Sequence, residues 1–191
     1  MADKLPNTEV NLLSIERYWF LTWTTYGSWL PGDKRGFTNP EHNSPDTPTA
    51  LPNPALQSFA KQQMKGPVVF LSRLHATSLF EQFQETARYR NWLLCAVAIM
   101  PTHIHMLVGV PNDPEPSKLL ADFKSYGSRT LNSRFGRPQS GTWWTESGSK
   151  RRLPDAHSVE ATVNYLRNQP NPLLIWTRDD GIESPRKRPA D

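Results

Sequence analysis

The residues of this chain best suited to chemistry are two histidines, His103 and His105, that are separated by a single residue. Alternate residues of a strand share a face, so both imidazoles would point the same way, while Ile104 and Met106 point into an apolar layer. Residues two apart in a strand lie about 7 Å from each other, so the rings can converge on one divalent cation. Two half-exposed surface histidines would show the same spacing, and the pair alone does not separate these interpretations.

A tyrosine and a glutamine add to this pair from a segment with helical periodicity. Val159, Val163 and Leu166 recur as a buried stripe, and Tyr165 and Gln169 stack one turn apart along its flank. A glutamine oxygen facing two imidazoles would complete a site of mixed nitrogen and oxygen ligands, which favours Mg²⁺ or Mn²⁺ over zinc. Each residue also has an ordinary structural interpretation. Tyr165 could be an amphipathic tyrosine at the edge of the core, and Gln169 could be a residue at the C-terminus of the helix that hydrogen-bonds to water. Of the five tyrosines, however, Tyr165 alone has a side-chain amide four residues later.

The segment Ala98–Val108, which reads Ala-Ile-Met-Pro-Thr-His-Ile-His-Met-Leu-Val, resembles a known motif. It is similar to the HUH motif (His, hydrophobic, His) of single-strand transposases with one catalytic tyrosine, such as the REP-associated tyrosine transposases and related insertion-sequence enzymes. The segment Tyr165–Gln169 matches the helix that carries the tyrosine in this family, and it follows His105 at the family's spacing. Residues 22–36 are similar to the first strand and loop of one branch. The resemblance extends from about residue 17 to residue 176.

This resemblance implies a metal-dependent enzyme that cuts and rejoins single-stranded DNA. Tyr165 would be the nucleophile that forms a 5′-phosphotyrosine, and His103, His105 and Gln169 would hold Mg²⁺ or Mn²⁺. The implied partners are single-stranded DNA hairpins or repeat ends. The family contains monomers and also dimers that exchange the tyrosine helix, so a homodimer stays open. The chain departs from the family in its long Pro-rich stretch and in Thr102, where many relatives have Asn, and both departures leave the DNA specificity open.

Three other functions compete with this interpretation. The first is a domesticated protein that binds hairpin DNA without cutting it. The second is an RNA-binding module on a similar sheet, although residues 103–110 offer histidines and aliphatic side chains where such a module needs aromatic ones. The third is a zinc hydrolase, which would work without Tyr165.

Basic residues are concentrated between residues 117 and 152, which contain eight Lys and Arg but only two acidic residues. This segment therefore carries a net charge of +6, and the rest of the chain carries −2, for a total of +4. Such a cluster among aromatic residues suits a nucleic-acid backbone, although a solvated helix face would look the same. By likeness to the family, the residues expected to contact phosphates or stack on bases are Lys118, Lys124, Arg129, Arg134, Lys150, Arg151, Arg152, Trp143 and Trp144. Core packing is the competing role for the two tryptophans.

Hydrophobic periodicity predicts the elements that must position these residues. Strands are expected at 17–25, 92–99 and 103–110, helices at about 78–89, 117–135 and 155–169, and a short strand or irregular segment at 136–152. This order predicts an α+β fold with a ferredoxin-like antiparallel sheet and helices packed on it, as in HUH endonucleases. The expected divisions are a lead-in at 1–16, one domain at 17–176 with a Pro-rich insertion at about 37–67, and a basic, disordered tail at 177–191.

The remaining features suit a cytoplasmic protein. No apolar run approaches the roughly 18–20 residues that span a bilayer, and the N-terminus lacks the apolar core of a signal peptide. Cys95 is the sole cysteine, which excludes an intramolecular disulfide and a zinc site made of cysteines.

Overall fold

The computed structural model describes residues 15–34, 51–111 and 114–178. Most of the expected lead-in and tail, and part of the Pro-rich stretch, lie outside these residues, so the expectations for them stay predictions.

One five-stranded sheet organises the described chain. Its strands are β1 (Arg17–Thr24), β2 (Leu93–Ile99), β3 (His103–Val110), β4 (Ser149–Leu153) and β5 (Leu174–Thr177). They lie in the order β4-β1-β3-β2-β5, and every neighbouring pair is antiparallel. The order of the first four strands is that of a ferredoxin-like sheet, which confirms the predicted α+β class. Strands β1 and β3 are central and pair along their full length, so their side chains have fixed neighbours.

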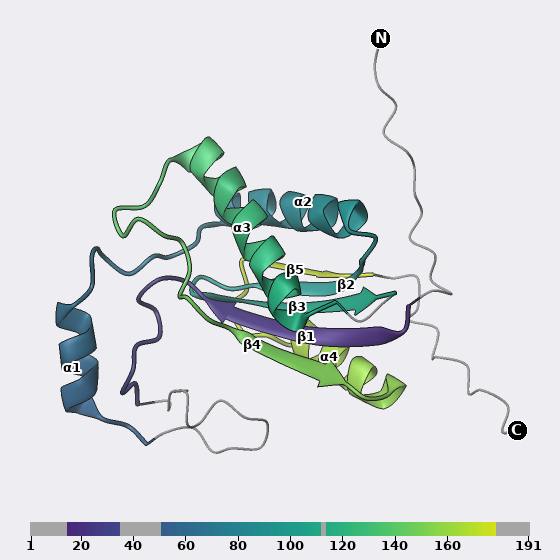
Figure 1. Ribbon diagram of the computed structural model, residues 1–191, viewed down its shortest axis with the longest axis horizontal. Helices are drawn as coiled ribbons and strands as arrows, with labels where there is room; N and C mark the ends of the chain where they lie inside the picture. The colour runs from purple at the N-terminus through teal and green to yellow at the C-terminus, as the bar shows by residue number, and fades with distance from the viewer. Residues whose placement is uncertain (1–14, 35–50, 112–113, 179–191) are drawn as a thin grey trace, which may run out of the picture.

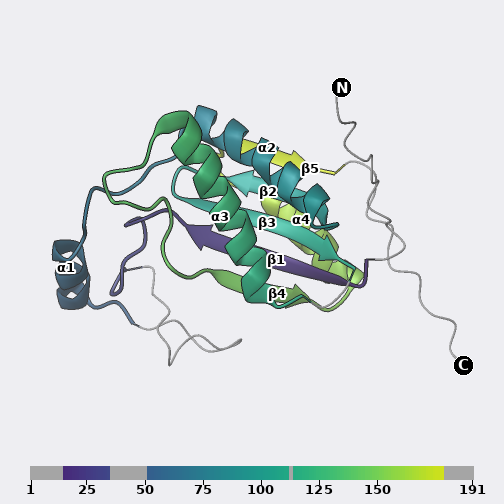
Figure 2. The same ribbon diagram turned by 45° about the horizontal axis from the view of Figure 1, so that its top comes forward.

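Helices cover both faces of this sheet. The helices α2 (Arg73–Tyr89) and α3 (Pro116–Phe135) pack against each other on one face, and α4 (Ala156–Arg167) lies on the opposite face. The two views in Figure 1 and Figure 2 show this three-layer arrangement, with α1 (Pro54–Gln62) standing apart from the sheet.

The sheet separates two apolar clusters. The larger lies under α2 and α3 and includes Trp23, Phe83 and Phe123, which are fully buried. The smaller lies under α4 and includes Leu107 and Leu166. Strand β3 contributes to both clusters in alternation, as its sequence predicted: its even-numbered residues from Ile104 to Val110 belong to the larger cluster, and its histidines are on the α4 face.

The structure corrects several of the predicted elements. Helix α2 begins at Arg73 with Ser72 as its N-cap, where the sequence suggested a start at Ser78. Ser78 is instead buried inside the helix, because the reciprocal bonds between Ser72 and His75 cap an earlier turn. The Pro-rich stretch contains α1, whose Pro54 occupies the first turn and therefore removes no helical hydrogen bond. Strand β5 was not predicted at all.

Two predictions about residue types can be checked directly. Cys95 is free and buried among apolar side chains, where burial raises the pKa of its thiol to about 12. Within the described parts of the chain, no helix is long and apolar enough to cross a membrane.

Candidate active site

The antiparallel pairing of β1 with β3 positions the two histidines. His105 lies opposite Thr22 and His103 lies opposite Thr24, so a row of small polar side chains on β1 flanks the imidazoles. The ring centroids of His103 and His105 are 4.9 Å apart, with their planes at 77°. Both rings lie on the α4 face, so the strand alternation expected from sequence brings them together.

Hydroxyl groups hold the Nδ1 atom of each ring. Thr22 Oγ1 is 2.8 Å from His105 Nδ1, and Thr102 Oγ1 is 3.2 Å from His103 Nδ1. When the Nδ1–H of His105 donates to Thr22, the lone pair of this imidazole is on Nε2. Nε2 is then the atom through which His105 can bind a metal ion.

Burial keeps His105 neutral. Its side chain is 7% exposed, and burial, with a smaller contribution from His103, lowers the pKa of His105 to about 4. A neutral imidazole is the form that ligates metals, so the ring is ready to bind a cation at neutral pH without first losing a proton.

An aromatic cluster brings Tyr165 from α4 to the histidines. The ring of Tyr165 is 5.5 Å from that of His105 and 6.0 Å from that of Phe20, in edge contacts. Phe20 in turn stacks on His105 at 5.5 Å and an interplanar angle of 25°. Tyr165 is nevertheless 50% exposed, so its phenol is both held against the site and open to a large ligand.

Gln169 differs from its predicted placement. Helix α4 begins after the N-cap Asp155, as expected, but it ends at Arg167, so Gln169 follows the helix. Its side-chain Nε2 donates to the Tyr165 carbonyl oxygen at 3.2 Å, and Oε1 is therefore the Gln169 atom available for a metal. This hydrogen bond holds the side chain of Gln169 against the last turn of α4. The role of Gln169 as a metal ligand stays a prediction.

The donor set suits a divalent ion of the predicted type. Two imidazoles from one strand share a face next to a phenol, and no third His, Cys, Asp or Glu joins them in the described chain. Among the described residues, the neutral side-chain oxygen of Gln169 is the predicted third ligand.

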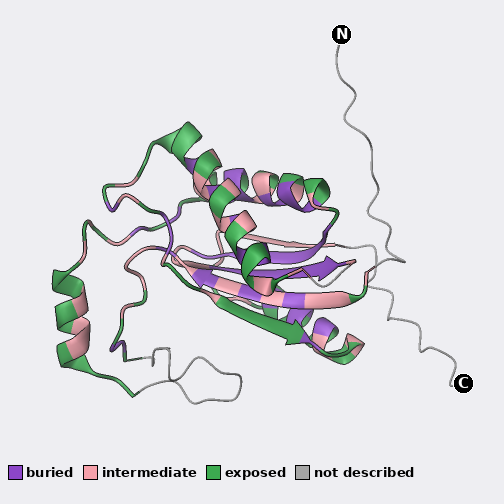
Figure 3. Cartoon of the chain, in the orientation of Figure 1, coloured by how far each residue is buried: buried purple, intermediate pink, exposed green. Residues whose placement is uncertain are grey.

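Strand β4 distributes its cations between the two faces of the sheet. Arg151 lies opposite Phe20, and its guanidinium carbon is 5.4 Å from the centre of that ring. Lys150 points to the other face, where its Nζ donates to Ser117 Oγ on α3. Most of β4 is exposed, as Figure 3 shows, because it forms an edge of the sheet.

The basic residues of α3 differ in how far they are already engaged. Lys118 is exposed, and Arg129 lies over the ring of Tyr126. Arg134 forms an ion pair with Glu81 at 2.9 Å. Arg152 is exposed on β4.

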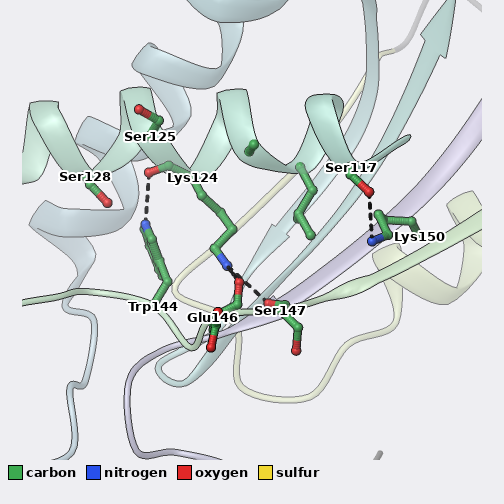
Figure 4. Close-up of a pocket in the computed structure, with 10 residues that line it drawn as sticks. Ser117, Lys124, Ser125, Ser128, Trp144, Glu146, Ser147 and Lys150 are labelled. Carbon is green, nitrogen blue, oxygen red and sulfur yellow. Dashed lines mark hydrogen bonds between the residues drawn. The ribbon is translucent and has the colours of Figure 1, made fainter. Parts of the chain in front are cut away.

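Trp143, Trp144 and Lys124 take structural positions, contrary to the expectation of DNA contacts. Both tryptophans are buried in the larger core, and the indole N–H of Trp144 donates to the Lys124 carbonyl oxygen at 3.0 Å. Lys124 Nζ donates to three carbonyl oxygens of residues 145–147, at 2.6, 2.8 and 3.1 Å. These bonds use all three of its N–H donors, and burial lowers its pKa to about 8. Figure 4 shows the bonds to Glu146 and Ser147. Neither ring can stack on a base without leaving the core.

Sequence reasoning missed Phe20 and Thr22. Both lie on the α4 face of β1, and the alternation of Tyr18, Phe20, Thr22 and Thr24 with buried residues is visible in the sequence. That pattern gives their face, but their role depends on which residues of β3 they meet.

Comparison with known proteins identifies the family of this chain. The family described as "Transposase IS200 like" matches residues 67–169, which include both histidines, Tyr165 and Gln169. The chain belongs to this family. No curated protein matches it.

Two solved structures are similar to this IS200-like transposase. One is a REP-associated tyrosine transposase bound to a REP hairpin, at 13% identity and a TM-score of 0.45, over 80% of this chain and 65% of that one. The chain thus spans about two thirds of that protein's length. The other is a candidate transposase from Deinococcus radiodurans R1, at 17% identity and a TM-score of 0.46, over 82% of this chain and 94% of that one.

Proposed function

We propose that this IS200-like transposase cleaves and rejoins single-stranded DNA, with Tyr165 as the nucleophile. The observation that carries the proposal is the position of the phenol, 5.5 Å between ring centroids from an imidazole of the same chain and half exposed. The tyrosine that contacts this imidazole comes from α4 of the same chain. Dimer formation and a cytoplasmic location stay predictions.

The proposed reaction is an exchange of one ester for another at phosphorus. The phenolic oxygen of Tyr165 attacks, the bond from phosphorus to the 3′ oxygen breaks, and a 5′-phosphotyrosine and a free 3′-hydroxyl result. The proton lost by the phenol is balanced by the proton that the 3′ oxygen gains. Attack by a 3′-hydroxyl on the phosphotyrosine reverses these steps and releases Tyr165. The ester bond energy is kept, so rejoining needs no nucleotide cofactor.

We assign His103 and His105 as metal ligands, with Gln169 Oε1 as the proposed third, and Mg²⁺ or Mn²⁺ as the ion. When bound, such an ion neutralises a nonbridging phosphate oxygen and makes phosphorus a better electrophile. The protein's own contribution is to hold the ligands and the nucleophile in place. Thr22 bonds to the imidazole of His105, and Phe20 contacts the ring of Tyr165 edge-on and so helps to orient it.

The proposed DNA partner is a single-stranded hairpin or repeat end, as membership in this family suggests. The basic side chains that remain candidates for phosphate contacts are Lys118, Arg129, Lys150, Arg151 and Arg152, with Arg134 partly engaged by Glu81. Binding through phosphate contacts should weaken steeply as salt is raised.

The test is to incubate the protein with labelled hairpin oligonucleotides and Mn²⁺ or Mg²⁺, and to look for both a nick and a covalent protein–DNA band. Tyr165→Phe should remove both. Tyr89→Phe, which alters an exposed tyrosine on α2, should preserve both.

Other results would assign one of the competing functions. Nicking that survives Tyr165→Phe and leaves no covalent band would indicate a hydrolase. Hairpin binding with no nick under any of these conditions would indicate a DNA-binding protein that has lost its chemistry. Preference for RNA hairpins without cleavage would indicate an RNA-binding module.

A further inference from the structure

Arg151 is a basic side chain that shares a contact, the ring of Phe20, with the candidate catalytic residues. It comes from the edge strand β4, and its guanidinium lies over Phe20 at 5.4 Å from the ring centre. The same ring stacks on His105 and meets Tyr165 edge-on. One phenylalanine therefore contacts a proposed metal ligand, the proposed nucleophile and a guanidinium.

The stacked position limits where this guanidinium can go. Attraction between the cation and the ring face holds the long side chain close to the sheet, where it would otherwise be free in solvent. Phe20 is itself fixed by the pairing of β1 with both neighbours, Leu107 on β3 and Arg151 on β4. Arg151 is thus preorganised beside the site although it is exposed.

In the described parts of the chain Arg151 has no carboxylate partner, whereas Arg90 pairs with Asp122 and Arg134 pairs with Glu81. Five N–H donors in a planar fork suit two oxygens of one phosphate. The group that would complete this arrangement is an anion placed between β4 and α4, next to the phenol.

We propose that Arg151 binds the scissile phosphate of the DNA, and that Phe20 positions it for this role. Arg151 would then act on the phosphate that reacts, in contrast to Lys150, which bonds to Ser117 on the α3 side of the sheet, and Lys118, which lies on α3 itself. This inference rests on the proposed function, because it takes the site of Tyr165 as the place of cleavage.

The first measurement is the single-turnover rate of covalent adduct formation. Removal of a preorganised charged donor to the reacting phosphate should slow this rate about 100-fold in Arg151→Gln. Arg151→Lys should recover only part of the loss, because an ammonium cannot form the two-pronged contact. Arg88→Gln is the matched control, since Arg88 is exposed on α2 on the other face of the sheet.

The second measurement separates the scissile phosphate from general charge. In Tyr165→Phe protein, which cannot cleave, the affinity for hairpin DNA is compared for an ordinary scissile phosphate and for an uncharged methylphosphonate at that position. Arg151→Gln should weaken binding of the first substrate and leave binding of the second unchanged.

The outcomes distinguish the two proposals. If wild-type protein forms no adduct, the proposed function fails. If wild-type protein forms the adduct and Arg151→Gln matches Arg88→Gln, the role of Arg151 is refuted and the role of Tyr165 stands. An equal loss of affinity for both substrates would also refute it, because Arg151 would then contact another phosphate or support the fold.

Discussion

The burial of His105 makes the stability of the metal-free protein depend on pH in a way that can be calculated. Its pKa is about 4 in the folded protein, against 6.5 when the side chain is exposed. Between these values the unfolded chain binds a proton and the folded chain does not, so the free energy of unfolding must fall as the pH falls. From pH 7 to pH 5, one group with these two pKa values lowers the free energy of unfolding by about 2 kcal/mol. The reason is that the logarithm of the ratio of the proton-binding terms, unfolded over folded, increases by about three, and each unit is worth RT.

The assay is urea unfolding in a chelating buffer at pH 7 and pH 5, for wild-type protein and for His105→Gln. Other groups titrate in this range, among them His75, whose pKa burial also lowers, so the result is the difference between the two proteins. Wild-type protein should lose about 2 kcal/mol more than His105→Gln. His157→Gln, a change at an exposed histidine of α4, should lose as much as wild type. Equal losses in wild type and His105→Gln would refute the conclusion that burial holds this imidazole neutral.

Two further predictions concern Thr22, which lies beside the site, and Lys124, which lies on the other face of the sheet. Thr22→Val removes the hydroxyl that is 2.8 Å from His105 Nδ1, and it should weaken Mn²⁺ binding about 10-fold in titration calorimetry. The control Thr77→Val, on α2, should leave Mn²⁺ affinity unchanged. Unchanged affinity in Thr22→Val would show that the hydroxyl does not orient the ring. Lys124→Met leaves three carbonyl oxygens without their donor and should lower the free energy of unfolding by about 1–3 kcal/mol. The slope of log affinity for hairpin DNA against log salt concentration should stay as in wild type for Lys124→Met, and it should fall by about 1 for Lys118→Gln. The reverse result would show that Lys124, and not Lys118, contacts a phosphate.

The parts of the site that follow from local periodicity could be predicted from the sequence. The face of His103 and His105 depends only on the two-residue repeat of a strand, and the flank position of Tyr165 depends only on the turn of a helix. Both predictions are confirmed by the structure. The predicted end of α4 was too late, because the chain leaves the helix after Arg167, before the proline that was expected to stop it.

The parts that depend on distant pairing could not be predicted. Phe20 acquires its contacts because β1 pairs with β3 on one side and β4 on the other, and neither register is encoded within residues 17–24. The clustering of basic and aromatic residues and the family likeness favour DNA contacts for Trp144 and Lys124, but neither indicates which side of a segment faces the core. Strand β5 is four residues long and follows two prolines, so it forms because the edge of β2 offers a partner.

The charges around the site explain why DNA and metal should depend on each other there. His105 is neutral, and no Asp, Glu or Cys joins the two histidines to form a group of three in the described chain, so the protein offers a cation little charge compensation. A phosphodiester would supply the missing negative charge to the ion and, on our proposal, to Arg151 as well. Each partner should therefore raise the affinity of the other by the same factor, since coupling between two bound ligands is reciprocal. On this proposal, the metal ion adds its positive charge to the site most strongly when the phosphate on which it would act is bound.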